Sequence, residues 1–131
     1  MNVRPSIVLL LALLVAACGT PPEERLAQAR LAAENKDLPL FLKYFTRRSA
    51  AFLRDLAANQ ARSKMQYLKD PLLVLPPGDL EEVNIDGKSA ILKVKGKGKA
   101  DEIRMFMEND EWSIDVFSLT RFWQPLREIG Q

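Results

Sequence analysis

The hydrophobic period of this 131-residue chain changes at Leu80. Before that residue, apolar side chains recur at the three- and four-residue spacing of a helix. One such stripe consists of Leu38, Phe41, Leu42 and Phe45. After Leu80, apolar and polar residues alternate, as they do in strands with one buried face. Helices followed by strands are typical of an α+β domain, and one domain is expected at this length.

The helical half contains start signals for three helices. Residues 20–23, Thr-Pro-Pro-Glu, read as a capping box with proline at the first helical position. Asp37 is the expected N-cap of the second helix, and Thr46 that of the third. The third pattern can be followed to Asp70, with a break near Asn59 left open.

Pro71 ends the helical half, and the apolar run Leu72–Leu75 reads as a buried connector or a short edge strand. Four strands follow, separated by three short turns, so that they are expected to be antiparallel neighbours. Their inward residues are predicted to be Val83, Ile85, Ala90, Leu92, Val94, Ile103, Met105, Met107, Trp112, Ile114 and Val116. We therefore expect three N-terminal helices packed on one face of a four-stranded antiparallel meander.

The first 17 residues have the pattern of a signal peptide. Arg4 is followed by Ile7–Ala17, eleven apolar or small residues, whereas a membrane-spanning helix needs about 20. The sequence Val-Ala-Ala-Cys that ends at Cys18 resembles the lipobox of bacterial lipoproteins. That resemblance implies that diacylglycerol is attached to Cys18 and that the leader is cut before it. The alternative is an ordinary secretory signal with a chance cysteine.

The lipobox resemblance divides the chain into a signal peptide (1–17), a lipidated tether (18–22) and a single α+β domain (23–131). It implies a bacterial cell envelope location with a membrane anchor at Cys18. Gly19, where sorting to the inner membrane favours Asp, implies the periplasmic face of the outer membrane if the host is Gram-negative. Four residues separate Cys18 from the expected helix and span about 13 Å at most, so the domain should lie close to the membrane.

Two segments of the strand half carry a second resemblance. Val83–Ala90 reads VNIDGKSA, and Met105–Asp115 reads MFMENDEWSID. Together with the element order, they resemble small bacterial members of the nuclear transport factor 2-like (cystatin-like α+β) superfamily. The resemblance implies a cone-shaped fold with a cavity between helices and sheet. That superfamily contains isomerases, dehydratases and non-catalytic binders, so the fold alone does not decide the function.

Composition excludes several classes of chemistry. The chain has no histidine and one cysteine, which excludes imidazole-based triads, histidine-rich zinc sites and an internal disulfide. Removal of the leader leaves 18 basic and 17 acidic side chains, a balance that argues against nucleic-acid binding. Asp115 and Tyr44, the residue types of an isomerase-like site, are predicted to point away from the apolar faces. No metal, cofactor or catalytic residue is therefore expected.

Aromatic side chains are the remaining candidates for a cavity or an interface. They are Phe41, Phe45, Trp112, Phe122 and Trp123. The alternative for Phe41 and Phe45 is that they form a core face of their helix. The alternative for Phe122 and Trp123 is that they cover an open end of the core. Basic residues between Arg47 and Lys69 form either a solvated face or a contact with anionic headgroups. The lysines between Lys88 and Lys99 suggest a phosphate strip or cross-strand pairs with acidic neighbours.

The sequence thus predicts a non-catalytic, lipid-anchored envelope protein that binds a protein partner or a small ligand near the membrane surface. One alternative is a small envelope-assembly lipoprotein with a scaffolding role, built of two helices and three strands. Another is an isomerase- or hydrolase-like enzyme that uses the cone cavity.

Overall fold

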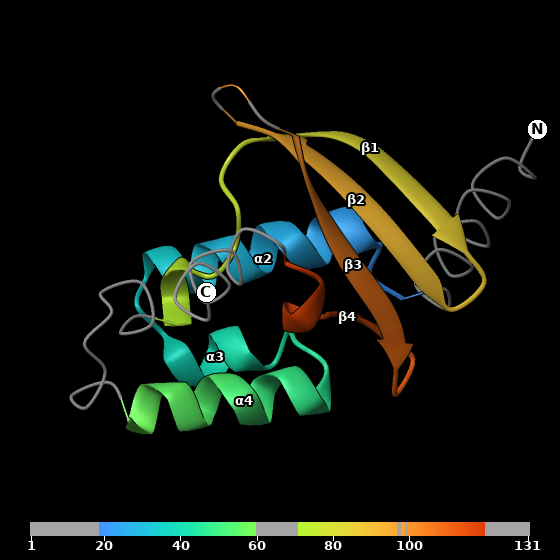
Figure 1. Cartoon of the computed structure of the whole chain (residues 1–131). Helices are drawn as coiled ribbons and strands as arrows, with labels where there is room; N and C mark the ends of the chain where they lie inside the picture. Colours follow the sequence, from blue (N-terminus) through green and yellow to red (C-terminus); the bar gives the residue numbers. More distant parts are fainter. Residues whose placement is uncertain (1–18, 60–70, 97, 99, 120–131) are drawn as a thin grey trace, which may run out of the picture.

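The computed structural model describes residues 19–59, 71–96, 98 and 100–119 (Figure 1). Three α-helices come first and a four-stranded sheet follows. The helices are α2 (Pro22–Glu34), α3 (Leu38–Leu42) and α4 (Arg47–Ala58). The strands are β1 (Asp79–Asp86), β2 (Ser89–Lys95), β3 (Ala100–Glu108) and β4 (Glu111–Ile114). Two short 3₁₀ helices, η3 (Pro71–Leu73) and η4 (Val116–Ser118), lie before and after the sheet.

The sheet is an antiparallel meander in the order β1-β2-β3-β4, as predicted. Gly87 in the first turn has a φ of 60°. Asn109 and Asp110, the two central residues of the last turn, have φ values of 50° and 61°. Positive φ at both central positions matches the right-handed twist of the flanking strands, which explains the tight hairpin between β3 and β4.

One face of the central strands forms the core with the helices. Ala90, Leu92, Val94, Ile103 and Met105 are at most 1% exposed, and register pairs Leu92 with Ile103. This is the face that alternation predicts. The order of elements and the four-stranded antiparallel sheet therefore confirm the α+β prediction.

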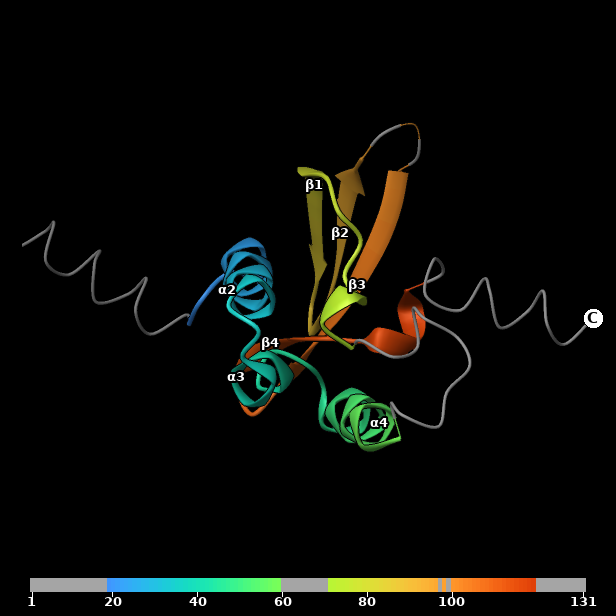
Figure 2. The ribbon, with the colours of Figure 1, turned by 90° about the vertical axis from the view of Figure 1, so that its left-hand side faces the viewer.

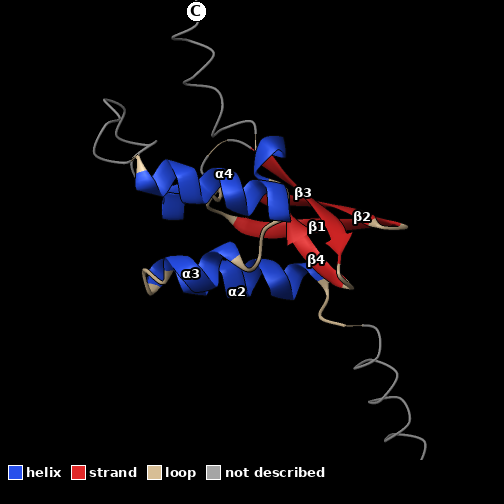
Figure 3. Cartoon of the chain, turned by 90° about the horizontal axis from the view of Figure 1, so that it is seen from below, coloured by secondary structure: helices blue, strands red, loops and turns tan. Residues whose placement is uncertain are grey.

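The helices lie in sequence order beside the sheet, with α3 between α2 and α4 (Figures 1 and 2). Helix α2 contacts β1, β2 and β4, so it crosses the sheet. Helix α4 is joined to the sheet through the segment before it. The amide of Thr46 donates to the carbonyl of Ile114 (2.9 Å), and the amide of Ile114 donates to the carbonyl of Tyr44 (2.8 Å). Seen from below in Figure 3, α3 overlaps α2, and α4 is set apart from both of them.

Two of the three predicted N-caps are confirmed. The side chain of Asp37 accepts from the amide of Leu40 (3.2 Å), and that of Thr46 accepts from the amide of Ser49 (3.2 Å). The capping box predicted at Thr20 is wrong. Pro21 is the N-cap of α2, and its carbonyl accepts the first helical bonds although it has no side-chain cap.

The break left open in the third helix is confirmed. Helix α4 ends at Ala58, and Asn59 is its C-cap. The continuation predicted as far as Asp70 lies outside the described residues.

Three further expectations need correction. Residues 71–73 form a 3₁₀ turn, so the run is a connector and not an edge strand. It is buried only in part, because Leu73 is 69% exposed. The last strand ends at Ile114, because the side chain of Asp115 accepts from the amide of Phe117 (3.2 Å) and starts η4 instead. Ile85 faces the helix side but is 57% exposed, because β1 is an edge strand that α2 covers only in part.

The connector reaches β1 through a close approach that only glycine allows. Gly78 has a φ of 124°, and a Cβ atom there would lie 2.5 Å from the backbone of Lys95 and Gly96. Within the ranges given above, no helix has the length and apolar composition required to cross a membrane.

Candidate functional site

The aromatic residues selected from the sequence are mainly core residues where the structure describes them. Phe41 is fully buried and stacks at a tilt on Phe45, with 4.8 Å between ring centroids. Trp112 is 6% exposed and belongs to the same cluster. Phe45 alone among them also lines a groove. Cys18, Phe122 and Trp123 lie outside the described residues.

That groove, which we call the α3–α4 groove, lies between these two helices and the β3–β4 turn and has a volume of about 1030 Å³. This is at the upper end of the range for small-molecule sites. Its lining consists of Leu38, Pro39, Leu42, Lys43, Phe45, Arg47, Ala50, Arg54, Glu108, Asn109, Glu111 and Ser113. Apolar residues of α3 and α4 therefore meet charged residues from both sides of the hairpin.

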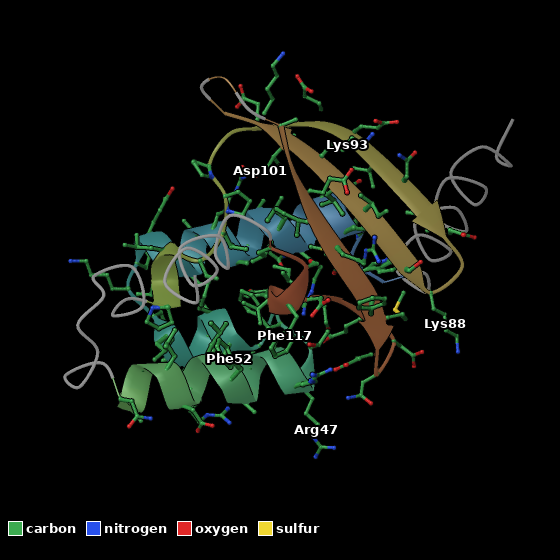
Figure 4. The ribbon with its side chains drawn as sticks, viewed as in Figure 1. Arg47, Phe52, Lys88, Lys93, Asp101 and Phe117 are labelled. Atoms are coloured by element: carbon green, nitrogen blue, oxygen red, sulfur yellow. The ribbon has the colours of Figure 1, made fainter. Side chains whose placement is uncertain are left out.

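The two acidic residues of the α3–α4 groove have partners within the fold. Glu108 accepts a hydrogen bond from the backbone amide of Arg47 (2.9 Å), at the first turn of α4, where a carboxylate is favoured. Figure 4 shows Arg47 at this end of the helix. Glu111 lies 3.8 Å from the guanidinium of Arg25.

Unlike the two acidic residues, the basic residues of the groove have no ion-pair partner among the described residues. Among the described residues, no carboxylate lies within ion-pair distance of the side chains of Lys43, Arg47 or Arg54. All three are exposed. Within the described ranges, the groove therefore has three cations without a paired acid, next to two acids that each have one contact in the fold.

The α3–α4 groove adjoins the start of the described chain. A Cβ atom built on Gly19 would lie 3.5 Å from the carbonyl oxygen of Asp110. Asp110 is flanked by the groove residues Asn109 and Glu111. The residue that follows Cys18 thus lies beside the rim of the groove.

Arg25 joins the elements that form one side of this region. Its Nε donates to the carbonyl of Trp112 (2.8 Å), and its Nη2 donates to the carbonyl of Lys43 (3.1 Å). The guanidinium also lies 4.5 Å from the centroid of the Tyr44 ring, a cation–π contact. Arg25 is 8% exposed, so a buried cation is compensated by two carbonyl groups, an aromatic face and Glu111.

Asp115 and Tyr44, the residues considered for an isomerase-like site, have structural contacts. Asp115 accepts from the amide of Phe117 (3.2 Å) and from the hydroxyl of Ser49 (3.5 Å). Ser49 is fully buried and also accepts from the amide of Val116 (2.9 Å). Tyr44 is covered by Arg25, as described above. Neither residue is part of the groove lining.

A second, smaller groove of about 420 Å³ lies between the end of α2 and the connector at residues 72–78. Arg30 donates to the carbonyl of Pro76 (2.9 Å) beside it. Burial lowers the pKa of Arg30, and the charge of Asp79 opposes this effect. We interpret this arginine as a brace between α2 and the connector.

Of the described lysines of the strand half, Lys93 supports the cross-strand alternative, whereas Lys88 and Lys95 have no described carboxylate within ion-pair distance. Lys93 lies 3.4 Å from Glu82 across β1 and β2, on the outward side of the sheet (Figure 4). The amide of Asn84, and then the charge of Lys93, hold the pKa of Glu82 below its usual value. Lys97 and Lys99 lie outside the described residues.

Most of the groove could not be predicted from the sequence. Arg47 and Arg54 belong to the basic stretch noted there, but Lys43, Glu108 and Glu111 were not selected. The N-cap at Thr46 and the Asn109-Asp110 turn could be predicted from the sequence, and they lie on the two sides of the groove. The local sequence does not indicate that these two segments are close in space. In the described part of the chain, no cluster of acidic side chains has the geometry of a metal site.

Comparison of the chain with protein-family models, with curated proteins and with solved structures finds no match.

Proposed function

We propose that this chain is a lipid-anchored protein of the bacterial cell envelope whose domain binds a small ligand or a protein partner at the membrane surface. The observation that carries the proposal is the position of Gly19 beside Asp110, at the rim of the α3–α4 groove. If Cys18 carries lipid, the anchor is one residue away from this rim. The largest recess we describe would then open next to the bilayer.

The lipobox-like sequence before Cys18 supports the anchor, and Gly19 supports the outer membrane of a Gram-negative host. Pro21 and Pro22 keep the tether short, because α2 begins at Pro22. The α+β architecture is compatible with a nuclear transport factor 2-like domain, which we retain as the proposed family. With three helices and four strands, the fold does not match the two-helix, three-strand scaffold that was the alternative.

The contacts of the ionisable groups favour binding over catalysis. Glu108 and Glu111 are engaged by the amide of Arg47 and by Arg25, while Asp115 accepts hydrogen bonds in the turn at η4. General-base catalysis needs an acceptor placed within hydrogen-bond reach of the substrate proton. The contacts just named instead give these three carboxylates a structural role. We therefore propose a binding role without a chemical step.

The anchor is tested by Cys18→Ser in the full chain, expressed in a Gram-negative bacterium and labelled with palmitate. The variant should incorporate no label above background and should no longer fractionate as a mature membrane protein. Thr20→Ser, which leaves Cys18 in place, is the matched control and should behave as the wild type. Equal labelling of the Cys18→Ser variant would refute the anchor.

The binding role is tested with a photo-crosslinking residue at Asn109 in intact cells. Adducts should form at this position and not at Lys95, which lies at the opposite end of the sheet from the β3–β4 turn. Equal yields at the two positions, or none at Asn109, would contradict a binding site in the α3–α4 groove.

A further inference from the structure

We infer that the α3–α4 groove docks the anionic headgroup of a phospholipid from the bilayer that carries the anchor. This inference rests on the proposed function and names the ligand of the same site.

Charge is the first argument. Lys43, Arg47 and Arg54 surround the groove without a carboxylate at ion-pair distance among the described residues. Glu108 keeps its negative charge when it accepts from a neutral amide, so the three cations and two acids of the lining sum to +1 (3 − 2). The guanidinium of Arg25 lies 3.8 Å from Glu111 and adds a further positive charge beside the groove. Basic residues near an anionic bilayer contribute about 1 kcal/mol each. A phosphodiester therefore complements the groove better than a neutral or cationic ligand.

The apolar part of the lining is the second argument. Leu38, Pro39 and Ala50 border the groove and are exposed or half-buried, so they are accessible to a ligand. Phe45 and Leu42 are buried and close its base. A free inorganic anion would leave this apolar surface in water, whereas the glycerol and the first acyl carbons of a lipid would cover it.

Position is the third argument. Gly19 lies against the carbonyl oxygen of Asp110. Two residues before Asp110, the side chain of Glu108 accepts a hydrogen bond from the backbone amide of Arg47. The cations of α4 therefore begin on the side of the domain where the anchor would attach. A headgroup in the same leaflet would be presented to the groove at a high effective concentration, because anchor and ligand belong to one surface.

The experiment uses the full lipidated chain in nanodiscs, observed by amide chemical shifts. In discs of phosphatidylcholine, increasing fractions of phosphatidylglycerol should shift the amides of Lys43, Arg47 and Asn109 in a saturable way. The amide of Lys95, at the far end of the sheet, should not move. Added salt should weaken the response, because exposed charges are screened.

Charge-removing variants locate the site. Arg47→Gln and Arg54→Gln should each raise the half-saturating fraction of phosphatidylglycerol about fivefold, the factor that corresponds to about 1 kcal/mol per basic residue. The bond to Glu108 is made by the backbone amide of residue 47, so Arg47→Gln leaves it intact. Arg48→Gln is the matched control, because the Arg48 guanidinium stacks on Phe117 (4.6 Å) and does not line the groove.

Three outcomes would overturn the inference. One is an equal response in discs without anionic lipid. Another is a response to Arg48→Gln as large as that to Arg47→Gln. The third is saturation of the same amides by inorganic phosphate in phosphatidylcholine discs, which would indicate a site for a free anion. Palmitate labelling of Cys18 is a separate measurement, so failure of the inference in a labelled protein is distinguishable from failure of the anchor, in which no label is incorporated.

Discussion

Arg25 shows how one buried side chain can join three parts of this fold. Its guanidinium binds the carbonyl of Trp112 in β4 and that of Lys43 after α3, while its own backbone belongs to α2. The planar fork of arginine presents several donors at fixed angles, and a lysine ammonium cannot reproduce that geometry. The sequence did not single out this residue, because a lone arginine in a helix is usually solvated.

We predict that Arg25→Met destabilises the domain by about 2–4 kcal/mol, because the buried carbonyl of Trp112 and the part-buried carbonyl of Lys43 lose donors that bear charge. The free energy of unfolding, measured by urea denaturation, checks this value. Arg54→Met, at an exposed position of α4, is the matched control and should change stability by less than about 0.5 kcal/mol. Equal effects of the two substitutions would contradict the role assigned to Arg25.

Glu82 gives a prediction about pH at the same scale. The Asn84 amide (3.2 Å) and Lys93 lower its pKa in the folded state. A lowered folded-state pKa stabilises the fold above the unfolded-state pKa, and this contribution is lost as pH falls through the folded value. Asn84→Ala should therefore raise the pKa of Glu82, as followed by NMR titration of its carboxyl carbon. A pKa of Glu82 that stays the same in the Asn84→Ala variant would contradict this role of Asn84.

At the scale of elements, alternation predicted the inward faces of the strands correctly but not how deeply each strand is buried. Val94, Leu92 and Ala90 of β2 are buried because β2 has a neighbour on each side. Ile85 has the same orientation but lies on an edge strand. Local capping signals behaved similarly: side-chain caps were found at Asp37 and Thr46, while Pro21 at the start of α2 has no side-chain signal to read.

We predict that Leu92→Ala costs about 2–5 kcal/mol, as expected for a large side chain removed from a packed core. Ile85→Ala, which removes an apolar side chain of the same size on the same face, should cost less than half as much. Both values come from the same denaturation experiment. Similar losses for the two variants would show that Ile85 is covered, against its exposure of 57%.

At the scale of the whole molecule, the α+β class could be predicted and the groove could not. The class follows from a change of period, which is a local property of the sequence. The groove joins residues 38–54 to residues 108–113, and this contact depends on how the sheet and the helices pack. That its cations lack a carboxylate partner among the described residues becomes evident only once the contacts of Glu108 and Glu111 are known.

The position of the groove beside Gly19 predicts an effect of tether length. Insertion of ten Gly/Ser residues between Cys18 and Gly19 would add a flexible chain with an end-to-end distance of about 16–19 Å. Lipid crosslinks from a photoreactive residue at Asn109 should then decrease relative to the native tether. Palmitate labelling of Cys18 serves as the control and should persist. Unchanged crosslinking would mean that the short tether does not position the groove.

The hydrogen bonds of Arg25 have a consequence for how this chain can vary over evolutionary time. Both acceptors are main-chain oxygens, which every amino acid provides. Residue 43 can therefore be substituted without loss of the bond that holds its segment to α2. Since residue 43 also lines the α3–α4 groove, substitutions there can change which ligand the groove prefers while the fold is preserved. At residue 43, the backbone carbonyl contributes to the stability of the fold, whereas the side chain contributes to ligand binding.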